Sequence, residues 1–123
     1  MPDGLFNNRR ILVVEDEYFI AESLSGALRE SGADVLRPVP SVVAALETLE
    51  REVLDVVVLD VNLGGEMAHP LGDMLLKCGV PFLFMTGYDQ SSLPERFAAV
   101  PRLEEPAETR AIMVEVGRLL KAA

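Results

Sequence analysis

Lysine is nearly missing from this chain of 123 residues. Only Lys77 and Lys121 are present, and 20 acidic residues against 11 lysines and arginines give a formal net charge of −9. Contacts with nucleic-acid phosphates or with anionic lipids require clustered cations. The composition therefore argues against a nucleic-acid or membrane-binding surface, and cationic partners fit the overall charge better.

Cysteine and histidine each occur once. Cys78 alone can form neither an internal disulfide nor a multi-cysteine zinc site, and we expect it to pack near a helix end. His69 has no further ligand residues around it at the spacing of a metal site, so we expect no chemical role for it. Disulfide and zinc frameworks are thereby excluded.

Long apolar runs and low-complexity segments are also absent. The apolar stretch 11–14 that follows the opening MPDGLFNNRR is too short for a signal-peptide core or a membrane span. We therefore expect a soluble, cytoplasmic protein. The length predicts a single domain over 1–123, with its core from about residue 10 to about residue 120.

Short apolar runs alternate with segments of helical periodicity. Continuous runs typical of parallel strands lie at 11–14, 56–59 and 80–85, with weaker candidates at 33–36 and 102–103. Amphipathic helices are predicted at 20–28, 42–53 and 112–120, a shorter helix at 70–78 stopped by Gly79, and a brief helix from a capping box at Ser92 to about residue 99. The order is (βα)5, which predicts a doubly wound α/β fold with one five-stranded parallel sheet.

Polar side chains gather at the predicted carboxyl ends of the strands, where such sheets bind ligands. These residues are Glu15, Asp16, Asp60, Thr86, Glu104 and Glu105. The carboxylates of Glu15, Asp16 and Asp60 make a plausible oxygen-ligand set for a hard cation such as magnesium. Asp60 directly follows a buried strand, and a carboxylate there can act as a nucleophile toward a phosphoryl group.

Each of these residues also has a structural interpretation. Glu15 and Asp16 can simply favour the start of the following helix, Asp60 can turn to water, and Thr86 can belong to a turn. A magnesium-dependent phosphatase of the haloacid dehalogenase type is a further alternative. That class, however, requires a second aspartate two residues after the first, where this chain has Asn62.

Four segments together resemble a known family. ILVVEDE at 11–17, VVVLDVNLGG at 56–65, FMTGY at 84–88 and the Glu-Pro pair at 105–106 are similar to the receiver domain of bacterial two-component response regulators. The resemblance covers about 10–120. It implies a flavodoxin-like fold of strand order 2-1-3-4-5 and a single-domain regulator without an effector domain, which is a signalling protein and not an enzyme.

The resemblance also implies roles for individual residues. Glu15 and Asp16 would help to hold Mg2+ or Mn2+, together with Asp60 and the backbone carbonyl of Asn62. Asp60 would accept a phosphoryl group from a sensor histidine kinase or a phosphotransfer protein, and Thr86 would contact that group and report phosphorylation. The face formed by the fourth helix, fifth strand and fifth helix would bind downstream partners and is compatible with a homodimer.

A finer resemblance concerns PFLFMTGY at 81–88, which is similar to the motif of the FAT GUY subgroup of small receivers. Met85 replaces an alanine of that motif, and Arg102 stands where other receivers carry an aromatic switch residue. This resemblance implies sensor kinases of the HWE and related families as partners, in stress signalling.

Glu105 departs from the family, which carries a lysine just before this proline. At about 4 Å and an effective dielectric constant near 20, reversing the charge turns an attraction of roughly 4 kcal/mol into a similar repulsion. Asp60 could still be phosphorylated with a less stable product, or the chain could be a pseudo-receiver that only docks partners. Alternatively, Glu105 and Glu108 could merely favour the N-terminus of the last helix. Lys77, Lys121 and Arg102 offer no evident substitute for the lysine.

Overall fold

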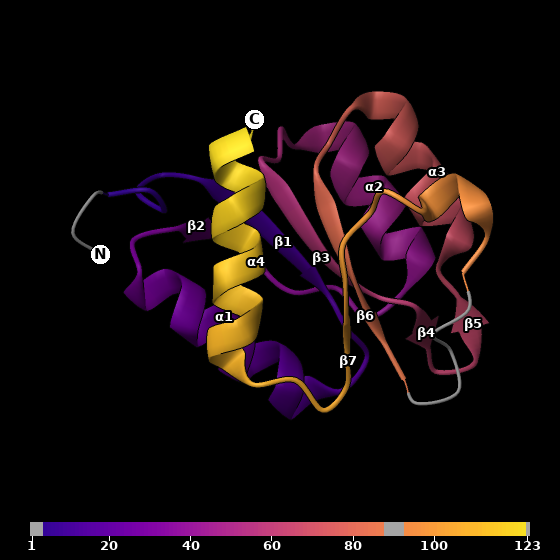
Figure 1. The fold of residues 1–123 in the computed structure, drawn as a ribbon, viewed down its shortest axis with the longest axis horizontal. Coiled ribbons are helices and arrows are strands. Elements are labelled where there is room, and N and C mark those ends of the chain that lie inside the picture. The colour runs from indigo at the N-terminus through magenta and orange to yellow at the C-terminus, as the bar shows by residue number, and fades with distance from the viewer. Residues whose placement is uncertain (1–3, 88–92, 123) are drawn as a thin grey trace.

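The computed structural model describes residues 4–87 and 93–122, which form one parallel sheet covered by helices on both faces (Figure 1). The sheet contains β1 (Arg10–Val14), β2 (Asp34–Val35), β3 (Val56–Asp60), β6 (Phe82–Thr86) and β7 (Arg102–Glu104). Its order is β2-β1-β3-β6-β7, and every neighbouring pair is parallel. Counted along the chain without the two hairpin strands, this is the expected order 2-1-3-4-5.

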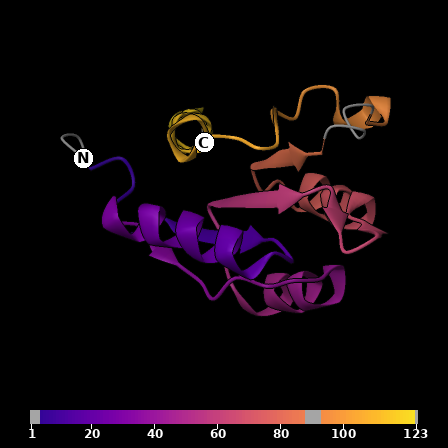
Figure 2. The same cartoon turned by 90° about the horizontal axis from the view of Figure 1, so that it is seen from below.

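The helices lie in two layers. α1 (Tyr18–Glu30) and α4 (Thr109–Ala122) cover one face of the sheet, and α2 (Val42–Arg51) and α3 (His69–Cys78) cover the other (Figure 2). Successive side chains of a strand point to opposite faces. Accordingly, Leu12 and Val14 of β1 pack toward α2 and α3, whereas Ile11 and Val13 pack toward α1 and α4. The continuous apolar strands are explained by burial on both sides.

Two details differ from the predicted (βα)5 pattern. Between β3 and α3 lies a small antiparallel hairpin of β4 (Asn62–Leu63) and β5 (Glu66–Met67). The described part of the fourth crossover contains a single 3-10 turn, η1 (Glu95–Phe97), where a brief α-helix was expected. Ser92, the expected cap, lies outside the described residues. The described part of the chain thus has four α-helices and not five.

The fourth crossover is anchored to α3 by side chains. Phe97 is fully buried, with its ring edge-to-face against Phe84 at 5.2 Å between centroids. Arg96 donates two hydrogen bonds to the carboxylate of Asp73, at 2.5 and 3.1 Å. Gly72 makes room for Phe97, because a Cβ on this glycine would lie 2.9 Å from the Phe97 ring. A tight turn, not a longer helix, brings Phe97 into this position.

Two smaller expectations about helix ends are wrong, and one is confirmed. α2 ends at Arg51, so Val53 lies beyond the helix and is 78% exposed. Cys78 is the last residue of α3 and is exposed, not packed. Gly79 ends α3 with a left-handed φ of 72°, as predicted. In the described segments no helix combines the length and apolarity that crossing a bilayer requires.

Candidate functional site

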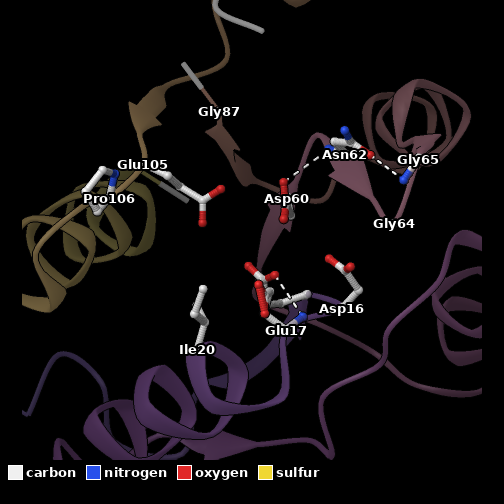
Figure 3. A pocket seen from close by; sticks show the side chains of 11 residues that line it. Asp16, Glu17, Ile20, Asp60, Asn62, Gly64, Gly65, Gly87, Glu105 and Pro106 are labelled. Atoms are coloured by element: carbon white, nitrogen blue, oxygen red, sulfur yellow. Dashed lines mark hydrogen bonds between the residues drawn. The ribbon is translucent and has the colours of Figure 1, made fainter. Parts of the chain in front are cut away.

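A cavity of about 550 Å3 opens at the carboxyl ends of β1, β3 and β7 (Figure 3). Carboxylic acids make up nearly half of its wall, and no lysine, arginine or histidine lines it among the described residues. The lining residues are Glu15, Asp16, Glu17, Ile20, Asp60, Asn62, Gly64, Gly65, Gly87, Glu105 and Pro106. The predicted strand-end residues other than Thr86 and Glu104 therefore meet in one place.

Glu15 and Asp60 form the floor of the cavity, with exposed fractions of only 6% and 7%. Backbone donors hold both carboxylates. The Glu17 N–H donates to Glu15 Oε2 at 3.1 Å, and the Asn62 N–H donates to Asp60 Oδ1 at 3.1 Å. The interpretation in which Asp60 turns to water is therefore wrong. The N-cap residue of α1 is Glu17, no side chain caps that helix, and the Glu15 carboxylate lies at its start.

The three acids named for a cation are close together. One carboxylate oxygen each from Glu15, Asp16 and Asp60 lie within 4.8 Å of one another. Gly64 adopts a left-handed φ of 63°, and a Cβ there would lie 3.4 Å from Asp16 Oδ2, so the hairpin turn approaches this carboxylate closely. A set of oxygen donors alone is what Mg2+ and other hard divalent cations prefer. The residues present fit such a cation.

The electrostatics of the cavity point the same way. Burial raises the pKa of Glu15 to about 8, and the charges of Asp60 and Glu105 add to the effect. Burial also raises the pKa of Asp60, to which the charge of Asp16 contributes. Carboxylates that repel one another in a partly dry cavity bind protons or metal cations more strongly than isolated ones do.

Glu105 points into the cavity from the segment after β7 (Figure 3). It is half-buried, and burial together with the charges of Asp60 and Asp16 raises its pKa. α4 begins only at Thr109, so Glu105 belongs to the cavity wall and not to the first turn of that helix. Its neighbour Glu104 is exposed and lines no part of the cavity.

Thr86 lies beside the cavity but not in its wall. It is the last residue of β6 and is 1% exposed, and its carbonyl accepts a hydrogen bond of 2.7 Å from the Glu105 N–H. Gly87, the next residue, lines the cavity. Tyr88, the end of the FMTGY segment, lies outside the described residues.

Three residues near the site were not predicted from the sequence. Glu17 and Ile20 line the cavity from the start of α1, and their position directly after the Glu15-Asp16 pair was the available signal. Arg37 lines a second cavity, of about 340 Å3, together with Glu15 and Asp16. It follows the end of β2, the strand next to β1, so strand order alone could have placed this cation near the site.

The raised pKa of Glu15 predicts how stability depends on pH without metal. The group binds its proton more tightly in the folded state, with a pKa of about 8 against a reference value of 4.5, so the unfolding free energy should fall as pH rises between these values. We expect a loss of roughly 1–3 kcal/mol in urea unfolding with a chelator present. Glu15→Gln should flatten the dependence, and a wild-type stability that rises over this range would contradict the prediction.

Comparison with known proteins agrees with the fold. The model of the family "Response regulator receiver domain" matches residues 11–100. The solution structure of SdrG from Sphingomonas melonis is 34% identical, covers 92% of this chain and 97% of its own, and has a TM-score of 0.75. A Chloroflexus aurantiacus protein described as a response regulator is 25% identical, with 94% and 99% covered and a TM-score of 0.80.

A response regulator receiver protein from Burkholderia phymatum is 23% identical, with 94% and 98% of the two chains covered and a TM-score of 0.80, which supports the fold alone. No curated protein matches the chain. The family model spans most of the sequence, and it includes both Asp60 and the acidic pair after β1. The chain belongs to the response regulator receiver domain family.

Proposed function

We propose that this receiver takes a phosphoryl group onto Asp60 from a histidine kinase or a phosphotransfer protein. The observation that carries the proposal is the buried Asp60 carboxylate, which ends β3 and faces a cavity shared with Glu15 and Asp16. Receiver domains interact with kinases and phosphotransfer proteins, and they bind Mg2+ at an acidic site. In this chain Glu15, Asp16, Asp60 and the backbone carbonyl of Asn62 would hold Mg2+ or Mn2+.

The transfer requires little of the protein beyond position and charge. An oxygen of Asp60 attacks the phosphorus, the new P–O bond replaces the P–N bond of the donor phosphohistidine, and the imidazole leaves with its electron pair. The Asn62 N–H orients the nucleophile through its hydrogen bond to Oδ1. A bound divalent cation would reduce the repulsion between the carboxylate and the incoming group. The Thr86 hydroxyl, one strand away, is proposed to move and contact the phosphoryl oxygens.

Intact-mass measurement tests this proposal. Wild-type protein should gain one phosphoryl group when it is incubated with Mg2+ and either acetyl phosphate or a phosphorylated kinase. The reason is that the cavity gives the donor access to the Asp60 carboxylate. Asp60→Asn should gain none, since an amide is not a competent acceptor. A modified Asp60→Asn protein would show that another residue is the acceptor. Phosphate turnover that depends on Asp60 would indicate an enzyme and not a regulator.

A second candidate is a pseudo-receiver that binds a cation permanently and serves as a docking module. Two features of the cavity wall favour it. The wall carries five acidic side chains, and none of its described residues is a cation at the place where the family has its lysine. Glu105→Lys discriminates the two. Phosphorylation of wild type supports a working receiver, whereas phosphorylation of Glu105→Lys alone supports the pseudo-receiver.

The donor is proposed to be a sensor kinase of the HWE or a related family, and the chain a member of the FAT GUY subgroup. This rests on the resemblance of PFLFMTGY at 81–88, of which 81–87 is described. The downstream partner, or a second copy in a homodimer, is proposed to bind η1, β7 and α4, which correspond to the fourth helix, fifth strand and fifth helix of the prediction.

The first turn of α1 predicts where a protein donor makes contact. Tyr18 and Phe19 are 69% and 82% exposed beside Ile20, which lines the cavity, so a donor that reaches Asp60 must cover them. Phe19→Ser should lower the rate of transfer from the kinase by about tenfold or more, the expected size for an aromatic anchor. Transfer from acetyl phosphate should not change.

Val53→Ser is the matched control for Phe19→Ser, since Val53 is 78% exposed and precedes β3 at the opposite end of the sheet. Kinase transfer to this variant should equal that of wild type. Equal loss with both donors would mean that Phe19 supports the cavity itself and does not contact the kinase.

A further inference from the structure

The segment 4–9 before β1 and the helix α4 enclose a groove of about 410 Å3, which shares no lining residue with the acidic cavity. Its lining contains three cations and no acidic side chain, in a chain whose net charge is −9. The lining residues are Leu5, Phe6, Arg110, Met113, Val114, Gly117, Arg118 and Lys121. The charge of the groove is therefore opposite in sign to the net charge of the molecule.

The floor of the groove is apolar. Phe6 is only 2% exposed beneath α4, while Val114 on the rim is 48% exposed. Residues three or four apart lie on one side of a helix, so Arg110, Val114 and Lys121 follow one stripe of α4. That stripe is about 16 Å long at 1.5 Å per residue, enough for three helical turns of a ligand. Figure 2 shows α4 and α1 on the same side of the sheet.

Gly117 deepens this groove without a requirement from the fold. A Cβ there would lie 3.5 Å from Leu5 Cδ2 and 3.8 Å from Phe6 Cζ, which are ordinary contacts. Glycine inside a helix costs about 1 kcal/mol relative to alanine. Alanine would therefore fit and stabilise the helix, so the packing of the fold does not require a glycine here.

Two of the three cations of the groove are not explained by structural pairing. Arg118 pairs with Glu115 at 2.8 Å, but no ion pair is found for Arg110 or Lys121 among the described residues. Lys121 in the last turn of α4 suits the helix dipole, whereas Arg110 in the first turn opposes it. A cation at an unfavourable position beside an apolar floor indicates a ligand with negative charge.

We propose that this groove docks an acidic amphipathic segment of a partner protein. Apolar side chains of the segment would lie on Phe6, Met113 and Val114, and its carboxylates would pair with Arg110 and Lys121. A nucleic acid is disfavoured because three cations cannot offset the repulsion of a strongly acidic molecule. A small inorganic anion would leave the apolar floor unused. The proposal does not depend on phosphorylation of Asp60.

The test uses two labelled synthetic peptides of about 12 residues, the length of three helical turns. Both have leucine at helical spacing, flanked by glutamate in one and by lysine in the other. The full-length protein should bind the acidic peptide saturably in fluorescence anisotropy and the lysine peptide far more weakly. Amide NMR shifts should be confined to the N-terminal segment and α4.

Charge reversal provides the matched comparison. Arg110→Glu with Lys121→Glu should weaken binding of the acidic peptide by about tenfold or more, as expected for two lost charge pairs. Arg29→Glu with Arg51→Glu makes the same change of net charge on α1 and α2 and should have little effect. Val114→Glu should weaken binding without loss of folding, because Val114 is exposed.

Three outcomes would overturn the proposal. The first is failure of the acidic peptide to saturate by about 1 mM, the weakest affinity expected of a real site. The second is that the protein binds the acidic and the lysine peptide equally well, or that the two charge-reversed double variants bind the acidic peptide equally well. The third is a dimer in sedimentation that Arg110→Glu with Lys121→Glu dissociates, because the groove would then bind a second copy of the chain.

Discussion

Replacement of Glu105 by lysine is expected to weaken Mg2+ binding by about tenfold to hundredfold and to stabilise the metal-free protein. The change moves the charge at this position by two units in a cavity that already holds Glu15 and Asp60. In a partly solvated site this corresponds to about 1–3 kcal/mol of interaction with the cation. Calorimetric titration with MgCl2 gives the affinity, and thermal unfolding with and without metal gives the stability.

Glu104→Lys is the matched control for this prediction. It makes the same charge change on the adjacent residue, whose side chain is exposed and lines no part of the cavity. The wild-type melting temperature should rise when Mg2+ is added, and this rise should shrink in Glu105→Lys but not in Glu104→Lys. A wild-type melting temperature that is the same with and without metal would contradict the assignment of the cation site.

Replacement of Phe97 by alanine is expected to cost about 3–5 kcal/mol of unfolding free energy, the usual range for a fully buried phenylalanine. Phe97 packs edge-to-face on both Phe82 and Phe84, and it fixes the fourth crossover against Gly72 of α3. No longer helix is present in the described part of that crossover to compensate. Urea unfolding monitored by circular dichroism provides the measurement.

Phe19→Ala is the control for that substitution, since Phe19 is 82% exposed and its loss should change stability by less than about 0.5 kcal/mol. Similar losses in the two variants would mean that the ring of Phe97 does not hold the crossover. A loss below about 1 kcal/mol for Phe97→Ala would mean that neighbouring side chains collapse into the space.

The central strands could be predicted from the sequence because burial on both faces leaves an unbroken apolar run. The runs at 11–14 and 56–59 nearly coincide with β1 and β3, and the parallel sheet followed from their alternation with helices. The hairpin of β4 and β5 could not be predicted. Its two-residue strands are too short for any periodicity, and only Gly64 and Gly65 marked the turn.

The fourth crossover shows a different limit. Its length and the Ser92 pattern favoured an α-helix, but the position of Phe97 depends on the space that Gly72 leaves in α3. Such a tertiary fit has no signature in the local sequence. Cys78, the last residue of α3, is likewise exposed, although Leu75 three residues earlier in the same helix is fully buried.

The acidic residues of the site were found by their place at the ends of strands. That reasoning gave Glu15, Asp16, Asp60 and Glu105 correctly as neighbours, because parallel strands bring their carboxyl ends to one edge. It predicted Thr86 as part of the site too, but Thr86 is buried and does not line the cavity. Arg37 was missed because only Lys77, Lys121 and Arg102 were considered as substitutes for the lysine, whereas Arg37 follows β2.

The acidic wall around Asp60 also acts on molecules that have not yet bound. Its field enriches cations at the mouth of the cavity and depletes anions, and salt weakens both effects. A small anionic phosphodonor therefore meets a lower local concentration at Asp60 than in bulk solution until a divalent cation has entered. A protein donor can bring positive side chains along with its phosphohistidine. If Asp60 accepts a phosphoryl group as proposed, Glu15, Asp16, Glu17 and Glu105 would favour protein donors over free phosphorylated metabolites, and the cation would have to bind first.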